Sequence, residues 1–171
     1  MDFRDVICGR ESVRSYDPSK PVDKLVLERI LEAGRVAPSA ANKQPWRFLI
    51  VSSRENLLKV KKCYPRPWFQ DAPHLLAVVG KTSEAWTRQD GYNSIETDLA
   101  IAMTHMILAA ENEGVGTCWV AAYDLGILRS ALGLGPDERI YTISPLGYPR
   151  AGYKRKVGKE RKALTAVVTY M

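Results

Sequence analysis

Arg10-Glu11-Ser12-Val13-Arg14 places two guanidinium groups and one hydroxyl at alternating positions, directly after a short apolar helix predicted over residues 2–9. On an extended segment, side chains two positions apart point to the same side. Arg10, Ser12 and Arg14 can therefore converge on one ligand. Guanidinium groups bind phosphate in a bidentate manner and stay charged at any working pH. The segment predicts a site for a phosphorylated small molecule, although a solvated turn is the more common explanation for three such residues taken alone.

A second segment, residues 37–46, leaves a predicted helix and enters a predicted strand through small, amide and proline residues. The small side chains of Ala40 and Ala41 allow the backbone to approach a flat ring closely. Asn42 and Gln44 offer donors and acceptors to a ring edge that carries carbonyls and nitrogens. The alternative is an ordinary connection rich in proline and asparagine.

The charge of this 171-residue chain is concentrated in one place. The formal net charge is +6, and residues 150–162 alone hold seven basic residues against one acidic residue. A nucleic-acid binder more often spreads its basic residues over a face. One basic segment is consistent with a local phosphate site or with a solvated tail, and no nucleic-acid partner is predicted.

The composition also limits the class of protein. The length fits one domain over residues 1–171, and the sequence shows neither a secretory leader nor an apolar run long enough for a membrane span. We therefore expect a soluble, cytoplasmic protein without a membrane partner. Cys8, Cys63 and Cys118 are odd in number and widely spaced, and neither His74 nor His105 has ligands nearby. Disulfides and a metal site are not expected.

Apolar periodicity predicts alternating elements without a strict strand–helix–strand repeat. This mixture favours an α+β sandwich with a central mixed or antiparallel sheet flanked by helices. A loop with an aromatic tip is predicted over residues 64–73. Helices are predicted over residues 2–9, 24–37, 53–63, 94–112 and 125–132, and strands over 47–52, 74–80, 117–122, 139–144 and 163–170.

Several blocks occur together in one order: RESVRSY (Arg10–Tyr16), APSAANKQPWRF (Ala37–Phe48), EGVGTCW (Glu113–Trp119), PLGYP (Pro145–Pro149) and KER (Lys159–Arg161). In content and order they resemble the nitroreductase family of FMN-dependent oxidoreductases. The resemblance implies an α+β sandwich that forms an intertwined homodimer, with two FMN sites at its interface.

The resemblance also implies which residues bind FMN. The first block holds the phosphate, the ribityl chain and the pyrimidine edge, and the late basic pair closes on the phosphate. A second group comes from the other protomer and lines the isoalloxazine, and a third passes near the ring and its N5. The three groups are Arg10, Ser12, Arg14, Lys159 and Arg161; Pro38, Ser39, Ala40, Asn42 and Gln44; and Thr117, Cys118, Trp119, Pro145, Leu146 and Gly147.

The activity implied by the resemblance is reduction of a nitroaromatic or quinone-like acceptor by NAD(P)H in a ping-pong mechanism through flavin N5. The flavin carries the chemistry, so no catalytic side chain is predicted. Gly114 and Gly116 do not complete a Rossmann fingerprint, so NAD(P)H is expected to bind over the flavin. A buried structural role is expected for Cys118 in preference to redox chemistry.

Some features depart from the family pattern or leave alternatives open. Glu11 stands where the family often has a second arginine or a histidine, and a lid is expected only from Trp68, Phe69 and Trp86. The alternatives are a non-catalytic flavin-binding module, a nucleic-acid-binding module that uses the basic tail, and a flavin-fragmenting or dehalogenating enzyme on the same scaffold.

Overall fold

The computed structural model describes residues 2–156 and 159–171. Its centre is a four-stranded antiparallel sheet of order β1-β2-β4-β3. Seven of the eight residues of β2 are buried, because helices cover both faces of the sheet. The strands are β1 (Trp46–Val51), β2 (His74–Lys81), β3 (Gly116–Thr117) and β4 (Glu138–Gly147).

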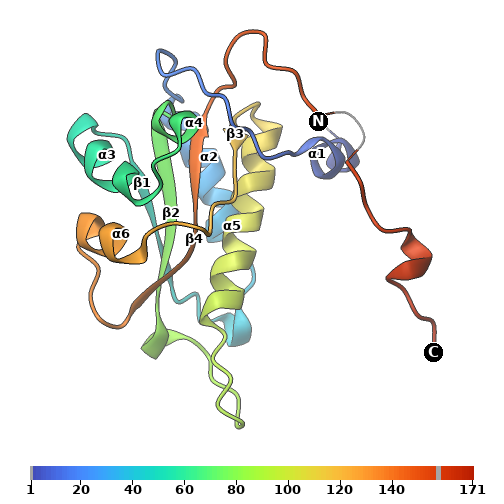
Figure 1. Ribbon diagram of the computed structural model, residues 1–171. Coiled ribbons are helices and arrows are strands. Elements are labelled where there is room, and N and C mark those ends of the chain that lie inside the picture. The colour runs from blue at the N-terminus through green and yellow to red at the C-terminus, as the bar shows by residue number, and fades with distance from the viewer. Residues whose placement is uncertain (1, 157–158) are drawn as a thin grey trace.

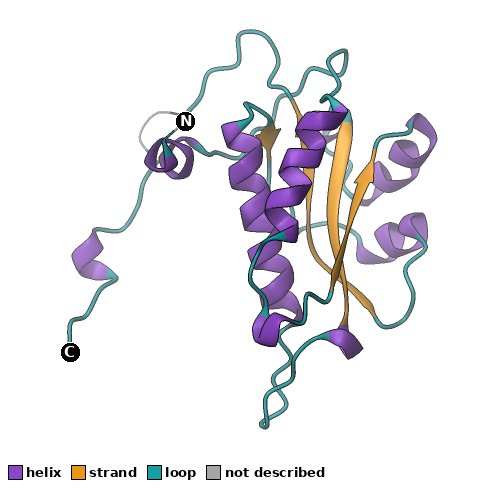
Figure 2. Cartoon of the chain, turned by 180° about the vertical axis from the view of Figure 1, so that it is seen from behind, coloured by secondary structure: helices purple, strands orange, loops and turns teal. Residues whose placement is uncertain are grey.

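Two layers of helices enclose this sheet (Figures 1 and 2). Helices α2 (Lys24–Arg35) and α5 (Ile95–Asn112) pack on one face, while α3 (Arg54–Val60) and α6 (Leu125–Leu132) lie on the other. Side chains of β2 alternate between the layers: Leu76 and Val78 join the α2–α5 core, and Leu75 and Ala77 join the α3–α6 core. The α+β prediction is confirmed, and the sheet is antiparallel.

Helices α2 and α5 approach each other closely at Gly34. A Cβ atom at this position would lie 2.7 Å from Cγ of Met106. Any residue other than glycine would force the methionine side chain to shift. Glycine at position 34 therefore allows the apolar face of α2 to pack closely against α5.

The Arg10–Arg14 segment connects α1 (Phe3–Gly9) to the edge of the sheet. Ser12 forms a parallel bridge with Thr117, and the amide of Val13 donates to the carbonyl of Thr117 at 2.8 Å. Glu11 and Val13 are buried between the more exposed Arg10, Ser12 and Arg14. The predicted alternation of this segment is therefore present.

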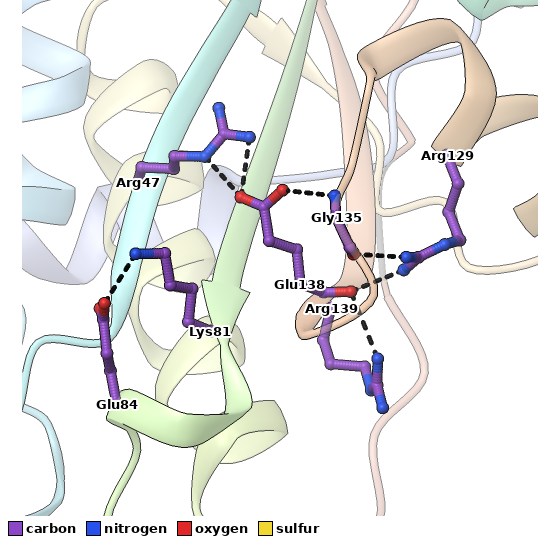
Figure 3. Close-up of polar contacts among 7 residues, drawn as sticks. All are labelled: Arg47, Lys81, Glu84, Arg129, Gly135, Glu138 and Arg139. Atoms are coloured by element: carbon purple, nitrogen blue, oxygen red, sulfur yellow. Dashed lines mark hydrogen bonds and ion pairs between the residues drawn. The ribbon is translucent and has the colours of Figure 1, made fainter.

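Polar contacts tie together the opposite end of the sheet (Figure 3). The carboxylate of Glu138 accepts from Nε of Arg47 at 2.8 Å and from the amide of Gly135 at 2.9 Å. Arg129 donates to the carbonyls of Glu138 and Gly135 at 2.6 and 2.5 Å. These contacts join β1, β4 and the turn between α6 and β4. They give each carboxylate oxygen of Glu138 a hydrogen-bond partner within the protein.

The tail that follows β4 leaves the sheet and runs past α1 (Figures 1 and 2). The predicted strand over residues 163–170 is wrong. Leu164–Ala166 form a single 3-10 turn, and Leu164 and Tyr170 are 71% and 91% exposed. No described strand lies beside this apolar stretch, so β-propensity alone produced no strand.

Two other predictions need correction. The strand predicted over residues 117–122 is shorter, because the Cys118 amide donates to Oγ of Ser144 and only an isolated bridge from Val120 to Ile143 follows β3. The predicted loop over residues 64–73 contains a short helix, α4 (Pro67–Gln70), and Phe69 is buried. Phe69 therefore cannot serve as a lid, since its ring packs against Tyr64.

No helix among residues 2–156 and 159–171 is long and apolar enough to cross a membrane.

Candidate functional site

Basic side chains from two distant segments meet around one cavity of about 210 Å³, which we call the basic hollow. Arg10, Ser12 and Arg14 approach it from the segment after α1, and the basic tail approaches it from the other side. Arginine and lysine here can offer charged donors to a phosphate group. The lining residues are Arg10, Glu11, Ser12, Arg14, Lys156, Lys159 and Arg161.

A second cavity of about 450 Å³, the apolar hollow, shares Arg10, Glu11 and Ser12 with the basic hollow. Its other walls come from α1, from one side of α5 and from the segment that begins with β3. These walls are Ile7, Thr104, Ile107, Leu108, Thr117 and Trp119. A charged cavity adjoining a largely apolar one suits a ligand with a phosphate at one end and a flat ring at the other.

Buried acidic groups hold the basic tail in place. Arg155 forms an ion pair with Glu111 of α5, whose side chain is only 5% exposed. The amide of Lys156 donates to Oε2 of Glu11 at 3.0 Å. These contacts fix the backbone of the tail beside the Arg10–Arg14 segment, so the basic hollow depends on residues about 145 positions apart.

The ammonium group of Lys159 makes contacts with the end of α1 that the sequence did not predict. It donates to the carbonyls of Cys8 at 2.7 Å and Gly9 at 3.0 Å, and also to that of Arg10. These contacts use the three N–H donors of the ammonium on the C-terminal end of α1. Lys159 therefore adds charge to the basic hollow and stabilises a helix end, while its direct contact with a phosphate stays a prediction.

Arg14 is supported by an aromatic ring. Its guanidinium carbon lies 5.8 Å from the centre of the Trp68 ring, which also packs near Tyr16. Such contacts restrict the orientation of a guanidinium group. Trp68 thus lies beneath Arg14, where it is part of the support of the basic hollow.

The second predicted segment lies at the other end of α5. The amide of Ala40 donates to Oδ1 of Asp98 at 2.9 Å, and the hydroxyl of Ser94 donates to Oδ2 at 2.7 Å. Ala41, Asn42 and Gln44 have left-handed φ values of 49°, 54° and 49°. Such values are uncommon for residues other than glycine and occur where the surrounding contacts enforce them.

These two groups of predicted residues do not meet within one chain. Asp98 and Leu108 are ten residues apart on α5, which corresponds to roughly 15 Å along the helix axis. Around the basic hollow the structure brings together Arg10, Ser12, Arg14, Lys159 and Arg161, whereas Pro38, Ser39, Ala40, Asn42 and Gln44 lie beside the first turns of α5. A site that uses both groups needs a second copy of the chain.

The third predicted group divides between the cavity and the core. Thr117 and Trp119 line the apolar hollow. Cys118 is buried on the other side, and burial raises the pKa of its thiol, in agreement with a structural cysteine. Pro145, Leu146 and Gly147 belong to the buried end of β4; the side chain of Leu146 lies in the α2–α5 core, and the backbone of this segment pairs with Gly116 and Thr117.

Some cavity residues were not predicted as site residues. Glu11 and Lys156 line the basic hollow, and Thr104, Ile107 and Leu108 contribute the α5 wall of the apolar hollow. The alternation of the Arg10–Arg14 segment could have indicated the inward position of Glu11. In the described part of the chain, no three His, Cys, Asp or Glu side chains are grouped as metal ligands.

Comparison with known proteins identifies the family. The model of the nitroreductase family matches residues 7–64 and 56–148. The chain belongs to the nitroreductase family.

Individual relatives agree with this assignment. The nitroreductase-family chain is 32% identical over 156 residues to a Methanothermobacter thermautotrophicus protein provisionally named NADH dehydrogenase/NAD(P)H nitroreductase, with 87% of this chain and 78% of that one covered. A nitroreductase family protein from Clostridium difficile 630 is 29% identical with a TM-score of 0.90, covering 99% of this chain and 98% of that chain.

A Bacteroides fragilis nitroreductase structure with bound FMN is 24% identical with a TM-score of 0.74, covering 100% of this chain and 99% of that chain. At this identity the likeness concerns the fold alone.

Proposed function

We propose that this protein is an FMN-dependent oxidoreductase that uses NAD(P)H to reduce a flat acceptor such as a nitroaromatic or a quinone, in a ping-pong mechanism. The observation that carries the proposal is the basic hollow beside the apolar hollow, since the two cavities share Arg10, Glu11 and Ser12. Membership of the nitroreductase family supports the same function.

The residues present fit FMN. Arg10, Ser12, Arg14 and Arg161 would hold its phosphate, and Thr117 and Trp119 would face the rest of the cofactor from the wall of the apolar hollow. When bound, the flavin supplies the redox chemistry by accepting hydride at N5 and passing electrons to the acceptor. The protein contributes orientation, and the basic hollow contributes fixed positive charge for the phosphate.

The site of this proposal is completed by an intertwined homodimer. Loop 38–44 is exposed in one chain, although it has three left-handed residues and a buried carboxylate that fixes it. A further cavity begins at the first turns of α5, where Glu96, Thr97 and Ala100 are among its lining residues. The proposal therefore takes Pro38, Ser39, Ala40, Asn42 and Gln44 from the partner, as the family resemblance implies.

The remaining parts of the proposal concern organisation and location. We treat residues 1–171 as one FMN-binding domain, since the two cores share one sheet. Cys8, Cys63 and Cys118 are free thiols, in agreement with a reducing compartment such as the cytoplasm.

An anaerobic absorbance spectrum of the purified protein tests the proposed function. FMN is added if no flavin co-purifies, and NADH or NADPH is then added before an acceptor. We expect a flavin band that is bleached by one nucleotide and restored by a quinone. A band that persists with both nucleotides would indicate a flavin-binding module, and the absence of any bound flavin after addition of FMN would overturn the proposal.

A further inference from the structure

A third cavity, of about 510 Å³, lies along the outward side of α5, the yellow helix of Figure 1. Six residues of α5 line it, and all six are exposed or half-buried, whereas Asp98, Leu99 and Met103 on the inward side are buried. Tyr141 of β4 completes the wall. We call the six residues the α5 face: Glu96, Thr97, Ala100, Ile101, Thr104 and His105.

The α5 face is arranged symmetrically about the midpoint between Ala100 and Ile101. Its residues form two rows with a spacing of four, so they lie on one side of the helix. A twofold axis through this midpoint, perpendicular to α5, would place a second copy of the helix alongside in the opposite direction. The facing pairs would be Ala100 with Ile101, Thr97 with Thr104, and Glu96 with His105.

The outer pair is complementary in charge and in hydrogen bonding. In the described part of the chain, neither Glu96 nor His105 has a hydrogen-bond or ion-pair partner. A ring N–H of His105 can donate to the carboxylate of Glu96, and the twofold axis would form this contact twice. Two helices running in the same direction would instead place Glu96 beside Glu96 of the second copy, where like charges repel. The charges therefore favour the antiparallel arrangement.

The same arrangement would join the two halves of the candidate site. Thr104 lines both the cavity of the α5 face and the apolar hollow, so the two cavities adjoin at this residue. Loop 38–44 is held at Asp98 through the amide of Ala40, at 2.9 Å. About this axis, Asp98 comes level with position 103 of the second copy, one residue before Thr104. Loop 38–44 of one chain would thus lie beside the apolar hollow of the other, whereas parallel helices would bring the two loops together.

We propose that the α5 faces of two chains pack against each other in opposite directions, with the twofold axis between Ala100 and Ile101 and with Glu96 of each chain bound to His105 of the other. The inference rests on the homodimer of the proposed function and deepens it, because it specifies the register in which one chain supplies loop 38–44 to its partner. Its test needs no flavin, so the two can fail separately.

Disulfide formation between introduced cysteines tests the register. Facing Cα atoms of two helices whose axes are about 8–10 Å apart come within disulfide range. On oxidation, Ile101→Cys should form a covalent dimer, since the two copies of this residue lie close to the axis. Thr97→Cys and Thr104→Cys alone should each form roughly tenfold less, because their like pairs are separated by roughly 10 Å along α5. A mixture of these two chains, refolded together, should restore the cross-link.

Three further variants serve as controls. Cys8→Ser is the background, since it removes the exposed thiol and leaves the buried ones. Ala100→Cys lies as close to the axis as Ile101→Cys and replaces it if that variant does not fold. Leu58→Cys is the matched control, because Leu58 is 62% exposed on α3, on the other face of the sheet. It should yield no covalent dimer.

Exchange of the charged pair tests the contact at the ends of the α5 face. Glu96→Lys should raise the dissociation constant of the dimer roughly tenfold, since two pairs are lost in each dimer. Glu96→Lys combined with His105→Glu should restore most of the affinity, because the pair is rebuilt with its charges reversed. Analytical ultracentrifugation measures both values. Equal weakening in the single and the double variant would overturn the pairing of Glu96 with His105.

Other results would overturn the arrangement as a whole. Equal cross-linking of Thr97→Cys, Ile101→Cys and Thr104→Cys, each with itself, would show that the helices are parallel. A dimer that forms no cross-link at α5 would place the interface elsewhere, and a monomer would also remove the partner from the proposed site. A cross-linked dimer that binds no FMN would instead overturn the proposed function and leave this inference intact.

Discussion

Each end of α5 carries a buried carboxylate, and the two carboxylates are stabilised by different kinds of partner. Asp98, near the beginning of the helix, is 1% exposed and accepts hydrogen bonds from two uncharged donors, the Ala40 amide and the Ser94 hydroxyl. Glu111, near its end, is 4% exposed and is paired with the guanidinium of Arg155. Each carboxylate fixes one half of the candidate site.

The difference shows how firmly each half is held. Loop 38–44 adopts backbone conformations that its residues do not favour, so hydrogen bonds of fixed direction are needed to maintain it. The basic tail is largely extended and is held by charge, which tolerates more variation in distance and is weakened by salt. We therefore expect the first half to be rigid before a ligand binds and the second half to be adjustable.

The largest expected effect comes from two variants, each of which disables a different half of the candidate site, and from the dimer that combines them. Arg10→Glu reverses a charge of the basic hollow, and Asn42→Pro forbids the left-handed φ of 54° at that position. Each variant alone should lose FMN. A hybrid dimer, isolated by two different affinity tags, should regain one intact site and bind about one FMN per two chains. Failure of the hybrid to bind FMN would place both halves in one chain.

A smaller effect is expected at the rigid end. Asp98→Ala leaves the Ser94 hydroxyl and the Ala40 amide without their acceptor, and should lower the free energy of unfolding by about 1–3 kcal/mol. Urea denaturation measures this change. Asp98→Asn keeps an oxygen for the Ala40 amide and serves as the control, with most of the stability retained. Equal losses in both variants would show that charge, not direction, matters here.

Loss of the ion pair at the C-terminal end of α5 should mainly affect local opening of the basic tail. Glu111→Ala removes the partner of Arg155, whose side chain is 46% exposed, so the loss of overall stability should be about 1 kcal/mol or less. Trypsin cleavage of the tail near Arg155 should nevertheless become faster. Unchanged cleavage would show that the contacts of Lys156 and Lys159 are sufficient to hold the tail.

The smallest effect concerns a buried group remote from both ends. His74 accepts from the Val22 amide at Nε2, at 3.0 Å, and burial, followed by the charge of Lys61, lowers its pKa. Its neutral form therefore stabilises the fold fully above the unfolded pKa of about 6.5, and this contribution is lost as pH falls through the lower folded value. Unfolding free energies at several pH values should show this dependence. His74→Gln should flatten it, whereas Asp98→Asn and Glu111→Gln should leave it unchanged.

The sequence predicted the elements whose signals are local. The apolar face of α5 and the buried run of β2 depend on neighbouring residues, and both were located within a residue or two of their observed limits. Residues 163–170 have similar β-propensity and form no strand, because a strand also requires a partner that composition does not reveal.

The residue types of the candidate site could be predicted from the sequence, but some of the contacts that these residues make could not. The alternation of Arg10, Ser12 and Arg14 follows from extended geometry, and the same geometry turns Glu11 inward. The position of the Lys159 ammonium on the carbonyls of α1 depends on how a distant tail folds back, which local pattern does not encode.

The long return of the tail has a consequence for biosynthesis. The ammonium of Lys159 and the carbonyl of Arg10 that it binds are separated by 149 residues of chain. The ribosome adds roughly 5–20 residues per second, so the Arg10–Arg14 segment waits at least several seconds for its basic counterpart. Helix α2 and the β1–β2 pair can form during that interval, but β4 ends only twelve residues before Lys159, so the sheet and the basic hollow are completed almost together. A phosphorylated ligand can therefore be bound only when nearly all of the chain has been made.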